Sequence, residues 1–200
     1  MLLDKIKNYS LILATQSPRR HSLMKGAGFD FKIIIPDNIE EIYPSGLSEP
    51  EVPIFLAELK ASWFDGKLKK DEIVITADTI VAIDGMVLGK PNGFNEAFSM
   101  LQRLSGRSHD VVTAVCLCNN QIKKTFSSVS KVYFRHLSNQ EIEYYINSFQ
   151  PYDKAGAYGA QEWIGFVGIE KIEGSYFNVM GFPIHQFYAE LEKFIEPNIS

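Results

Sequence analysis

Short apolar runs alternate along this chain with longer segments whose apolar residues recur at helical spacing. The pattern predicts strands at 10–15, 31–35, 72–83, 111–119 and 124–134, and helices at 18–28, 51–69, 95–104, 139–148 and 183–194. We expect the third strand to break at its polar centre, residues 77–79, and the last two strands to form an antiparallel pair. Strands that alternate with helices predict an α/β fold in which helices flank a mixed central sheet.

Composition limits the kinds of partner. A chain of 200 residues with 46% hydrophobic and 22% charged residues can bury one sizeable core. We expect one domain over residues 1–200, pinched into two lobes around a cleft. The net charge of −4 argues against a nucleic-acid partner but permits a local cationic pocket for a small phosphate ligand. No run approaches 18 apolar residues, so we expect a cytoplasmic protein with no membrane contact.

Cysteine and histidine usage disfavours two further classes. Cys116 and Cys118 occupy alternate positions of an apolar run, where both side chains point to one face as small hydrophobes. Two cysteines make no disulfide framework. The four histidines lack metal-ligand spacing, which disfavours a zinc site.

The end of the first predicted strand has the chemistry of a phosphate site. Residues 11–14 are apolar, and Pro18 suits the first position of the helix that follows. The polar side chains at this junction are Thr15, Ser17, Arg19 and Arg20. Hydroxyls, free helical N–H groups and guanidinium forks all suit phosphate oxygens. The alternative is a capped helix with two solvated arginines.

Asp78 interrupts an apolar strand, and burial of a carboxylate is costly unless a cation, a metal or a reacting group compensates it. We therefore favour a functional Asp78 with a cationic partner over a structural ion pair. Lys60, on a predicted helix, and Lys90, between a glycine and a proline, could share its site. Each could equally be a solvated surface lysine.

Two weaker features complete the candidates. The loop 36–50 carries Glu41 and is either an active-site rim or an exposed acidic turn. In residues 153–161, small residues would allow a ligand to approach the backbone, and Gln161 could pair with a base edge through its amide. The same glycines would also suit a β-bulge.

Six short segments, taken in their order along the chain, resemble the motifs of one family. They are Leu-Ala-Thr-x-Ser-Pro-Arg-Arg, Leu-Ala-x-x-Lys-Ala, Ala-Asp-Thr, Leu-Gly-Lys-Pro, Leu-Ser-Gly-Arg-x-His and Asp-Lys-Ala-Gly-Ala-Tyr-Gly-x-Gln. This set is similar to the motifs of Maf-type nucleoside triphosphate pyrophosphatases and covers nearly the whole chain. The resemblance implies an inosine triphosphatase-like fold and hydrolysis of a nucleoside triphosphate to the monophosphate and pyrophosphate, with Mg²⁺ or Mn²⁺ as cofactor.

The resemblance also implies roles for particular residues. Arg20, Lys60 and Lys90 would neutralise phosphate charge, and Thr15 and Ser17 would orient oxygens. Asp78 would be either the proton acceptor for water or a metal ligand, in the second case together with Glu41. A homodimer is a reasonable assembly for this family.

Three residues indicate the branch. Arg19, Thr79 and Gln161 match the branch that acts on dTTP and UTP, which implies pyrimidine triphosphates, including modified ones, and a role in cleaning the nucleotide pool. The alternatives are a 7-methylguanosine triphosphate pyrophosphatase and a nucleotide-binding regulator of septum formation that performs no turnover.

Three other residues depart from the family pattern. Thr15 stands where serine is usual and keeps the hydroxyl, Ala114 replaces part of a Thr-Gly-Val string, and Glu162 stands where glycine is common. We expect the departures at Ala114 and Glu162 to affect loop geometry rather than chemistry.

Overall fold

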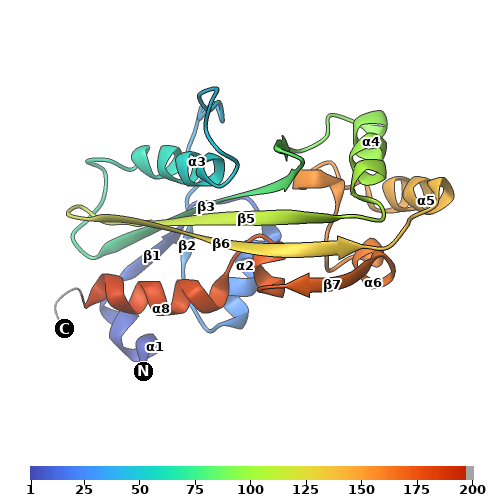
Figure 1. Ribbon diagram of the computed structural model, residues 1–200. Helices are drawn as coiled ribbons and strands as arrows, with labels where there is room; N and C mark the ends of the chain where they lie inside the picture. Colours follow the sequence, from blue (N-terminus) through green and yellow to red (C-terminus); the bar gives the residue numbers. More distant parts are fainter. Residues whose placement is uncertain (197–200) are drawn as a thin grey trace. The chain divides into compact units, whose positions relative to one another are not determined.

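The computed structural model describes residues 1–196, which contain one mixed sheet with helices packed on it (Figure 1). Its seven strands are β1 (Ser10–Leu13), β2 (Lys32–Ile33), β3 (Glu72–Ile83), β4 (Met86–Leu88), β5 (Ser108–Cys118), β6 (Lys123–Phe134) and β7 (Ile169–Glu173). The strand order is β2-β1-β3-β5-β6-β7, with β4 also paired to β3. β1 is parallel to β2 and β3, whereas β4 and β7 pair antiparallel with β3 and β6. The predicted mixed α/β class is confirmed.

The helices fall close to their predicted ranges. They are α1 (Leu2–Lys5), α2 (Pro18–Gly26), α3 (Glu51–Ser62), α4 (Phe94–Leu104), α5 (Asn139–Phe149), α6 (Trp163–Gly168), α7 (Tyr176–Val179) and α8 (Ile184–Ile195), with 3-10 turns at Ile6–Asn8 and Ala155–Ala157. The prediction that α3 reaches residue 69 is wrong. The chain leaves the helix after Ser62 and turns at Gly66, whose φ of +72° lies in the left-handed region.

β3 is continuous, so the predicted break at residues 77–79 is also wrong. Its polar centre stays extended because other elements satisfy its polar groups. Arg20 donates to the Ala77 carbonyl at 2.8 Å, and Lys60 donates to the Asp78 carboxylate at 2.6 Å. Tertiary partners can hold a carboxylate inside a strand that a sequence pattern alone would interrupt.

β5 and β6 are hydrogen-bonded neighbours joined by residues 119–122. A connection of this length permits only antiparallel pairing, because parallel strands need a crossover of about a dozen residues. The Asn119 N–H donates to the Ile122 carbonyl at 3.0 Å and closes the turn. The predicted antiparallel pair is therefore confirmed.

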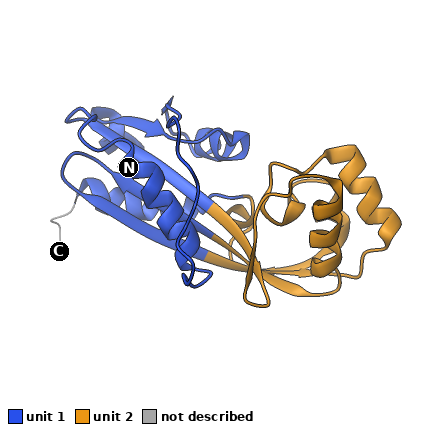
Figure 2. Cartoon of the chain, turned by 90° about the horizontal axis from the view of Figure 1, so that it is seen from above, with its two compact units in different colours: residues 1–78, 113–128, 181–200 blue, residues 79–112, 129–180 orange. Residues whose placement is uncertain are grey.

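The chain divides into two compact units (Figure 2). Unit 1 comprises residues 1–78, residues 113–128 and the segment that begins at 181, and unit 2 comprises residues 79–112 and 129–180. β3, β5 and β6 each contribute residues to both units. Each unit is described separately below.

In unit 1 the sheet buries both of its faces. One face, with Leu13, Ile75 and Leu117, packs with Met24 of α2 and Phe187 of α8. On the opposite face, Ile12, Val74, Cys116 and Cys118 pack with Ala57 of α3. Successive strand residues alternate between the two clusters, as period-2 geometry requires. Both cysteines are free, buried and on the same face, as predicted.

Unit 2 has a single core between its strands and helices α4, α5 and α6. Val81, Val132 and Phe134 of the strands pack with Leu101 of α4 and Tyr145 of α5 in this cluster. α5 begins with a capping box in which Ser138 and Glu141 exchange hydrogen bonds, which fixes where the helix starts.

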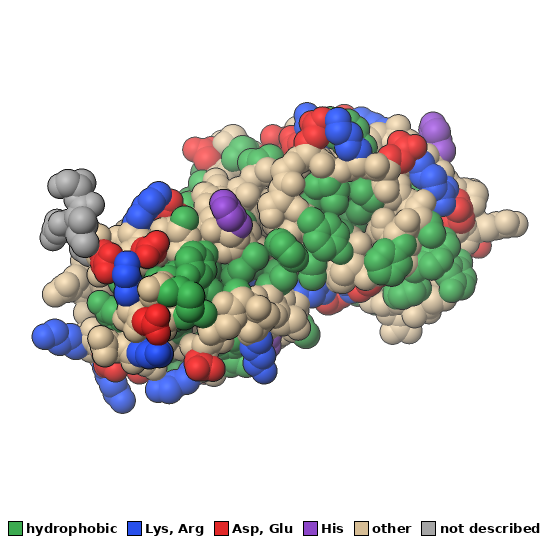
Figure 3. Space-filling view, turned by 90° about the horizontal axis from the view of Figure 1, so that it is seen from below, with side chains coloured by type: hydrophobic (Ala, Val, Ile, Leu, Met, Phe, Trp, Pro, Cys, Tyr) green, Lys and Arg blue, Asp and Glu red, His purple; other side chains and the backbone are tan. Residues whose placement is uncertain are grey.

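Some large hydrophobic side chains reach the surface (Figure 3). Ile42 in unit 1 and Phe166 in unit 2 have exposed fractions of 71% and 75%. Scattered apolar exposure is common on monomeric proteins and assigns no partner, so the homodimer stays a prediction. Within residues 1–196, no helix is both long and apolar enough to span a bilayer.

Candidate active site

The junction of β1 and α2 places a hydroxyl beside a helix N-terminus. Thr15 follows the buried end of β1 and is itself 9% exposed, and its Oγ1 accepts from the Ser17 backbone N–H at 3.2 Å. Pro18 occupies the first turn of α2, as predicted. The N-terminal turn of a helix carries partial positive charge, which suits an anion.

Arg20 ties this junction to β3. Its Nη1 donates to Thr15 Oγ1 at 3.2 Å and to the Ala77 carbonyl at 2.8 Å, and its Nε donates to the Gly181 carbonyl at 2.9 Å. Burial lowers the pKa of the Arg20 guanidinium, while the negative charge of Asp78 opposes that shift. An arginine remains protonated under either influence, so it brings a fixed positive charge to the end of β1.

Lys60 joins two carboxylates. Its Nζ lies 2.6 Å from Asp78 Oδ1 and 3.1 Å from Glu41 Oε1. α3 supplies Lys60, the long loop after β2 supplies Glu41, and β3 supplies Asp78. The side chains of Lys60 and Asp78 are 14% and 11% exposed, whereas Glu41 is 46% exposed. The cationic partner predicted for Asp78 is therefore Lys60.

The environment of Asp78 favours a proton acceptor. Burial raises the pKa of its carboxyl above the ordinary value, and the positive charges of Lys60 and Arg20 reduce that increase. A carboxylate whose pKa is raised towards neutrality accepts a proton more readily than an exposed one. Because Oδ1 is held by Lys60, Oδ2 is the oxygen through which Asp78 would accept that proton.

Five of the predicted residues thus gather in unit 1: Thr15, Arg20, Glu41, Lys60 and Asp78. Ser17 and Arg19 belong to the same junction, and both are half-buried. Thr79, Lys90 and Gln161 belong to unit 2.

Within unit 2 the structure brings two of the sequence motifs together. The Gly156 N–H donates to the Gly89 carbonyl at 3.0 Å, so the Gly-Lys-Pro turn that carries Lys90 is bonded to the glycine-rich segment that ends at Gln161. Gly156 has a φ of +67°, and a Cβ there would lie 2.9 Å from Val81 Cγ2. Glycine is therefore required at this position by close packing, and Lys90 itself is exposed.

The histidine of the Leu-Ser-Gly-Arg-x-His motif is part of the core. His109 is 2% exposed, and its Nε2 lies 2.7 Å from the Tyr158 hydroxyl. Its ring packs edge-to-face with Phe134 and Tyr158. Burial lowers the pKa of His109 to about 4, so the ring is neutral at physiological pH.

A group that the sequence did not predict lies in unit 2. Lys154, 8% exposed, contacts Glu162 at 3.0 Å and Asp153 at 2.7 Å, and the hydroxyl of Tyr145 donates to the Glu162 carboxylate. The one available signal was Glu162 itself, a charged residue at a position where the resembled family commonly has glycine.

The unit 1 group fits a hard divalent cation only when the ligand supplies further oxygens. Asp78 and Glu41 offer carboxylate oxygens, but no set of three or more His, Cys, Asp or Glu side chains in residues 1–196 could hold a metal ion. Mg²⁺ is commonly bound by one or two carboxylates together with substrate phosphates. The donor set is therefore compatible with Mg²⁺ or Mn²⁺ bound together with a phosphate ligand.

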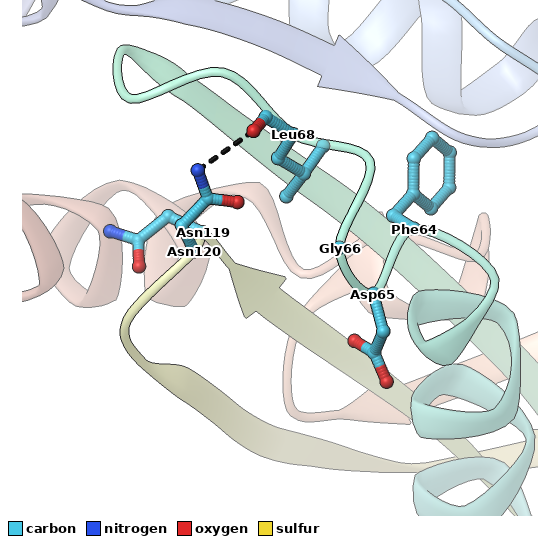
Figure 4. A pocket seen from close by; sticks show the side chains of 6 residues that line it. All are labelled: Phe64, Asp65, Gly66, Leu68, Asn119 and Asn120. Atoms are coloured by element: carbon cyan, nitrogen blue, oxygen red, sulfur yellow. Dashed lines mark hydrogen bonds between the residues drawn. The ribbon is translucent and has the colours of Figure 1, made fainter.

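Unit 1 also contains a pocket of about 460 Å³ near the turn after α3 (Figure 4). It is lined by Phe64, Asp65, Gly66, Leu68, Asn119 and Asn120. The Asn120 amide donates to the Leu68 carbonyl at 2.7 Å and closes one side of it. None of the predicted site residues lines this pocket.

A mixed α/β sheet that places two cations and a buried carboxylate beside a helix N-terminus is typical of phosphate-binding proteins. The match to the family model described as Maf-like protein extends over residues 10–194. The chain belongs to the Maf family.

Two curated relatives are similar over nearly their whole length. A dTTP/UTP pyrophosphatase of Porphyromonas gingivalis is 47% identical over 98% of this chain and 100% of that protein. A dTTP/UTP pyrophosphatase of Flavobacterium johnsoniae is 48% identical over 96% of this chain and 98% of that protein. Among solved structures, a HAM1 protein from Coxiella burnetii matches with 15% identity and a TM-score of 0.49, over 92% of this chain and 99% of that one.

Proposed function

We propose that this protein hydrolyses dTTP and UTP to the nucleoside monophosphate and pyrophosphate. The observation that carries the proposal is the contact of Lys60 with Asp78 beside Arg20. Asp78 is a carboxylate whose pKa is raised by burial, and it lies close to two positively charged side chains. The relatives in Porphyromonas gingivalis and Flavobacterium johnsoniae are named dTTP/UTP pyrophosphatases, which supports the same substrates.

In the proposed reaction, water forms a new bond to the α-phosphorus while the bond from that phosphorus to the bridging oxygen breaks. Asp78 accepts the proton of the water through Oδ2 and later releases it to solvent. Arg20, the N-terminus of α2 and the Thr15 hydroxyl bind phosphate oxygens, where negative charge accumulates. Pyrophosphate is the leaving group.

Lys60 has two functions in this scheme. It holds Asp78 Oδ1 at 2.6 Å and so fixes the direction of the second carboxylate oxygen, and its charge offsets part of the substrate's negative charge. A divalent cation, held by Glu41 with substrate oxygens, would neutralise the remaining phosphate charge. In the alternative scheme Asp78 is a ligand of that cation together with Glu41 and is not the proton acceptor. Lys90, Ser17 and Arg19 are proposed as further phosphate contacts.

Base recognition is proposed for Gln161 and Thr79. The Gln161 amide carries one acceptor and one donor group, which match the N3–H and O4 of uracil or thymine. Modified pyrimidine triphosphates with the same edge would be accepted too, which gives the protein a role in cleaning the nucleotide pool.

The test is pyrophosphate release from the purified protein with Mg²⁺ or Mn²⁺. The substrates are dTTP, UTP, CTP, 7-methylguanosine triphosphate, inosine triphosphate and the standard purine triphosphates. We expect the highest kcat/KM for dTTP and UTP. Preference for 7-methylguanosine triphosphate would replace the proposed substrate, and nucleotide binding without turnover would replace the enzyme by a nucleotide-binding regulator.

A further inference from the structure

The segment that presents Gln161 is tied on both sides to one buried tyrosine. The Gly159 N–H donates to the Tyr145 hydroxyl at 3.0 Å, and that hydroxyl donates to the Glu162 carboxylate. Tyr145 is fully buried, and burial together with Glu162 raises its pKa, so the hydroxyl keeps the proton that it donates. The residues on either side of the Ala160–Gln161 pair are thereby fixed by the same group.

Lys154 holds the same carboxylate from its other side. Its Nζ lies 3.0 Å from Glu162 Oε1, and the lysine is 8% exposed. Tyr145 uses Oε2 of Glu162, so both carboxylate oxygens have a partner. A carboxylate with two directional partners in a largely buried place keeps one orientation.

The amide of Gln161 and this carboxylate both border Gly159. A Cβ on Gly159 would be 2.9 Å from Gln161 Nε2, 2.9 Å from Glu162 Cδ and 3.1 Å from Glu162 Oε2. The amide nitrogen and the carboxylate therefore share the space above Gly159, which exists because that residue has no side chain. The negative charge of Glu162 favours an orientation in which the NH₂ group of the Gln161 amide faces the carboxylate and the carbonyl group faces away from it.

The carbonyl end is the part of Gln161 that lacks a protein partner. Among the described residues, no hydrogen-bond donor reaches Gln161 Oε1, although that atom is buried. A buried acceptor without a donor is unfavourable, and a ligand N–H that reaches it would relieve the cost.

We propose that Glu162, held by Lys154 and Tyr145, fixes the orientation of the Gln161 amide and thereby makes the enzyme discriminate uracil and thymine from cytosine. This inference rests on the proposed function. Uracil and thymine offer N3–H as a donor and O4 as an acceptor, whereas cytosine offers an N3 acceptor and an N4 donor. A glutamine that can rotate its amide by half a turn would pair with uracil, thymine and cytosine. A glutamine whose amide is fixed pairs with uracil and thymine only.

Glu162 is therefore a positioning residue, and its effect is measured as the ratio of kcat/KM for UTP to kcat/KM for CTP. The Glu162→Gln variant keeps the volume and removes the charge. We expect it to lower the ratio about tenfold or more, through a higher KM for UTP and a gain for CTP. A purely structural role would reduce both substrates together and leave the ratio unchanged.

Two further variants complete the experiment. Gly159→Ala adds a Cβ where Gln161 Nε2 and Glu162 meet and leaves every charge in place, so it should lower the ratio even if Glu162→Gln folds poorly. Glu170→Gln makes the same chemical change at an exposed position of β7 and should leave the ratio within about twofold, since a distant screened charge has little effect.

The outcomes separate this inference from the proposed function. If wild-type protein prefers UTP, and Gln161→Ala lowers the ratio while Glu162→Gln and Gly159→Ala do not, the positioning role is wrong and the function stands. If wild-type protein hydrolyses UTP and dTTP but shows no preference for UTP over CTP, the positioning role is wrong and the proposed hydrolysis of UTP and dTTP stands. If it hydrolyses neither UTP nor dTTP, both are wrong.

Discussion

Lys60 and Asp78 meet at 2.6 Å between Nζ and Oδ1, although one lies on α3 and the other near the centre of β3. Both side chains are largely buried, so their charges interact through protein rather than water. An isolated buried ion pair contributes little net stability, because desolvation offsets the attraction. The pair is better explained by its effect on the Asp78 carboxylate, and the first prediction tests that effect.

Replacement of Lys60 should change the pH dependence of turnover. Lys60 lowers the pKa of Asp78, so the Lys60→Met variant should carry an Asp78 whose pKa is higher still. Asp78 accepts a proton only when ionised, so activity should be lost on acidification at a higher pH than in the wild type. We also expect kcat/KM to fall about 100-fold, because a charged group near the phosphates is gone. The measurement is kcat/KM for UTP against pH.

Lys69→Met is the matched control for this variant, since Lys69 is an exposed residue of the same unit. Its pH profile should overlay that of the wild type. An acid limb that does not move in Lys60→Met would contradict the electrostatic role of Lys60.

Arg20 should not tolerate lysine. Three acceptors on three segments use its Nε and Nη1 donors, and a lysine has one point charge in place of this fork. We expect Arg20→Lys to lower kcat/KM for UTP about 100-fold, with Arg103→Lys at an exposed position as the control. Equal activity of Arg20→Lys and wild type would show that charge alone is needed.

Glu41 should affect the metal requirement. Its carboxylate is 46% exposed and lies 3.1 Å from Lys60, which leaves it accessible to a cation bound with substrate. In Glu41→Gln the Mg²⁺ concentration that gives half-maximal rate should rise about tenfold, with most of the rate recovered at saturating Mg²⁺. Glu40→Gln, one residue earlier and also exposed, should leave the Mg²⁺ dependence unchanged. A Glu41→Gln titration that overlays the wild type would remove Glu41 as a ligand.

His109 should make the fold sensitive to acid. Its pKa is about 4 in the folded protein against an ordinary value of 6.5, so the unfolded chain binds a proton first as pH falls. The stability from this neutral ring is present above pH 6.5 and is lost progressively from there to about pH 4. The free energy of unfolding should be about 2 kcal/mol smaller at pH 5 than at pH 7 from this group alone.

Denaturant unfolding at the two pH values measures this difference. His109→Gln should reduce the dependence on pH, whereas His185→Gln, at an exposed position, should retain it. Identical pH dependence in His109→Gln and wild type would mean that His109 is already protonated in the fold at pH 5.

Local patterns predicted much of this fold and part of its site. Pro18 after an apolar strand predicted the start of α2, and the alternate spacing of Cys116 and Cys118 predicted their shared buried face. These features depend on neighbours in sequence, and short-range geometry determines them.

Features that depend on distant partners were not predictable. The sequence pattern predicted a strand break at Asp78, because the Arg20 and Lys60 donors that keep the strand intact come from other elements. The same holds for Glu162, whose partners Tyr145 and Lys154 lie 17 and 8 positions away in sequence. Only folding brings such groups within hydrogen-bonding distance, so no local pattern encodes the pairing.

The central claim is that Asp78 accepts the proton of the attacking water, and Asp78→Asn tests it most directly. Asparagine keeps the size of the side chain and an oxygen that can accept from Lys60, but it cannot act as a base. We measure pyrophosphate release from UTP at saturating Mg²⁺, together with UTP binding by calorimetry. The account predicts a fall in kcat of about 100-fold or more with UTP still bound, whereas a kcat near that of the wild type would contradict it.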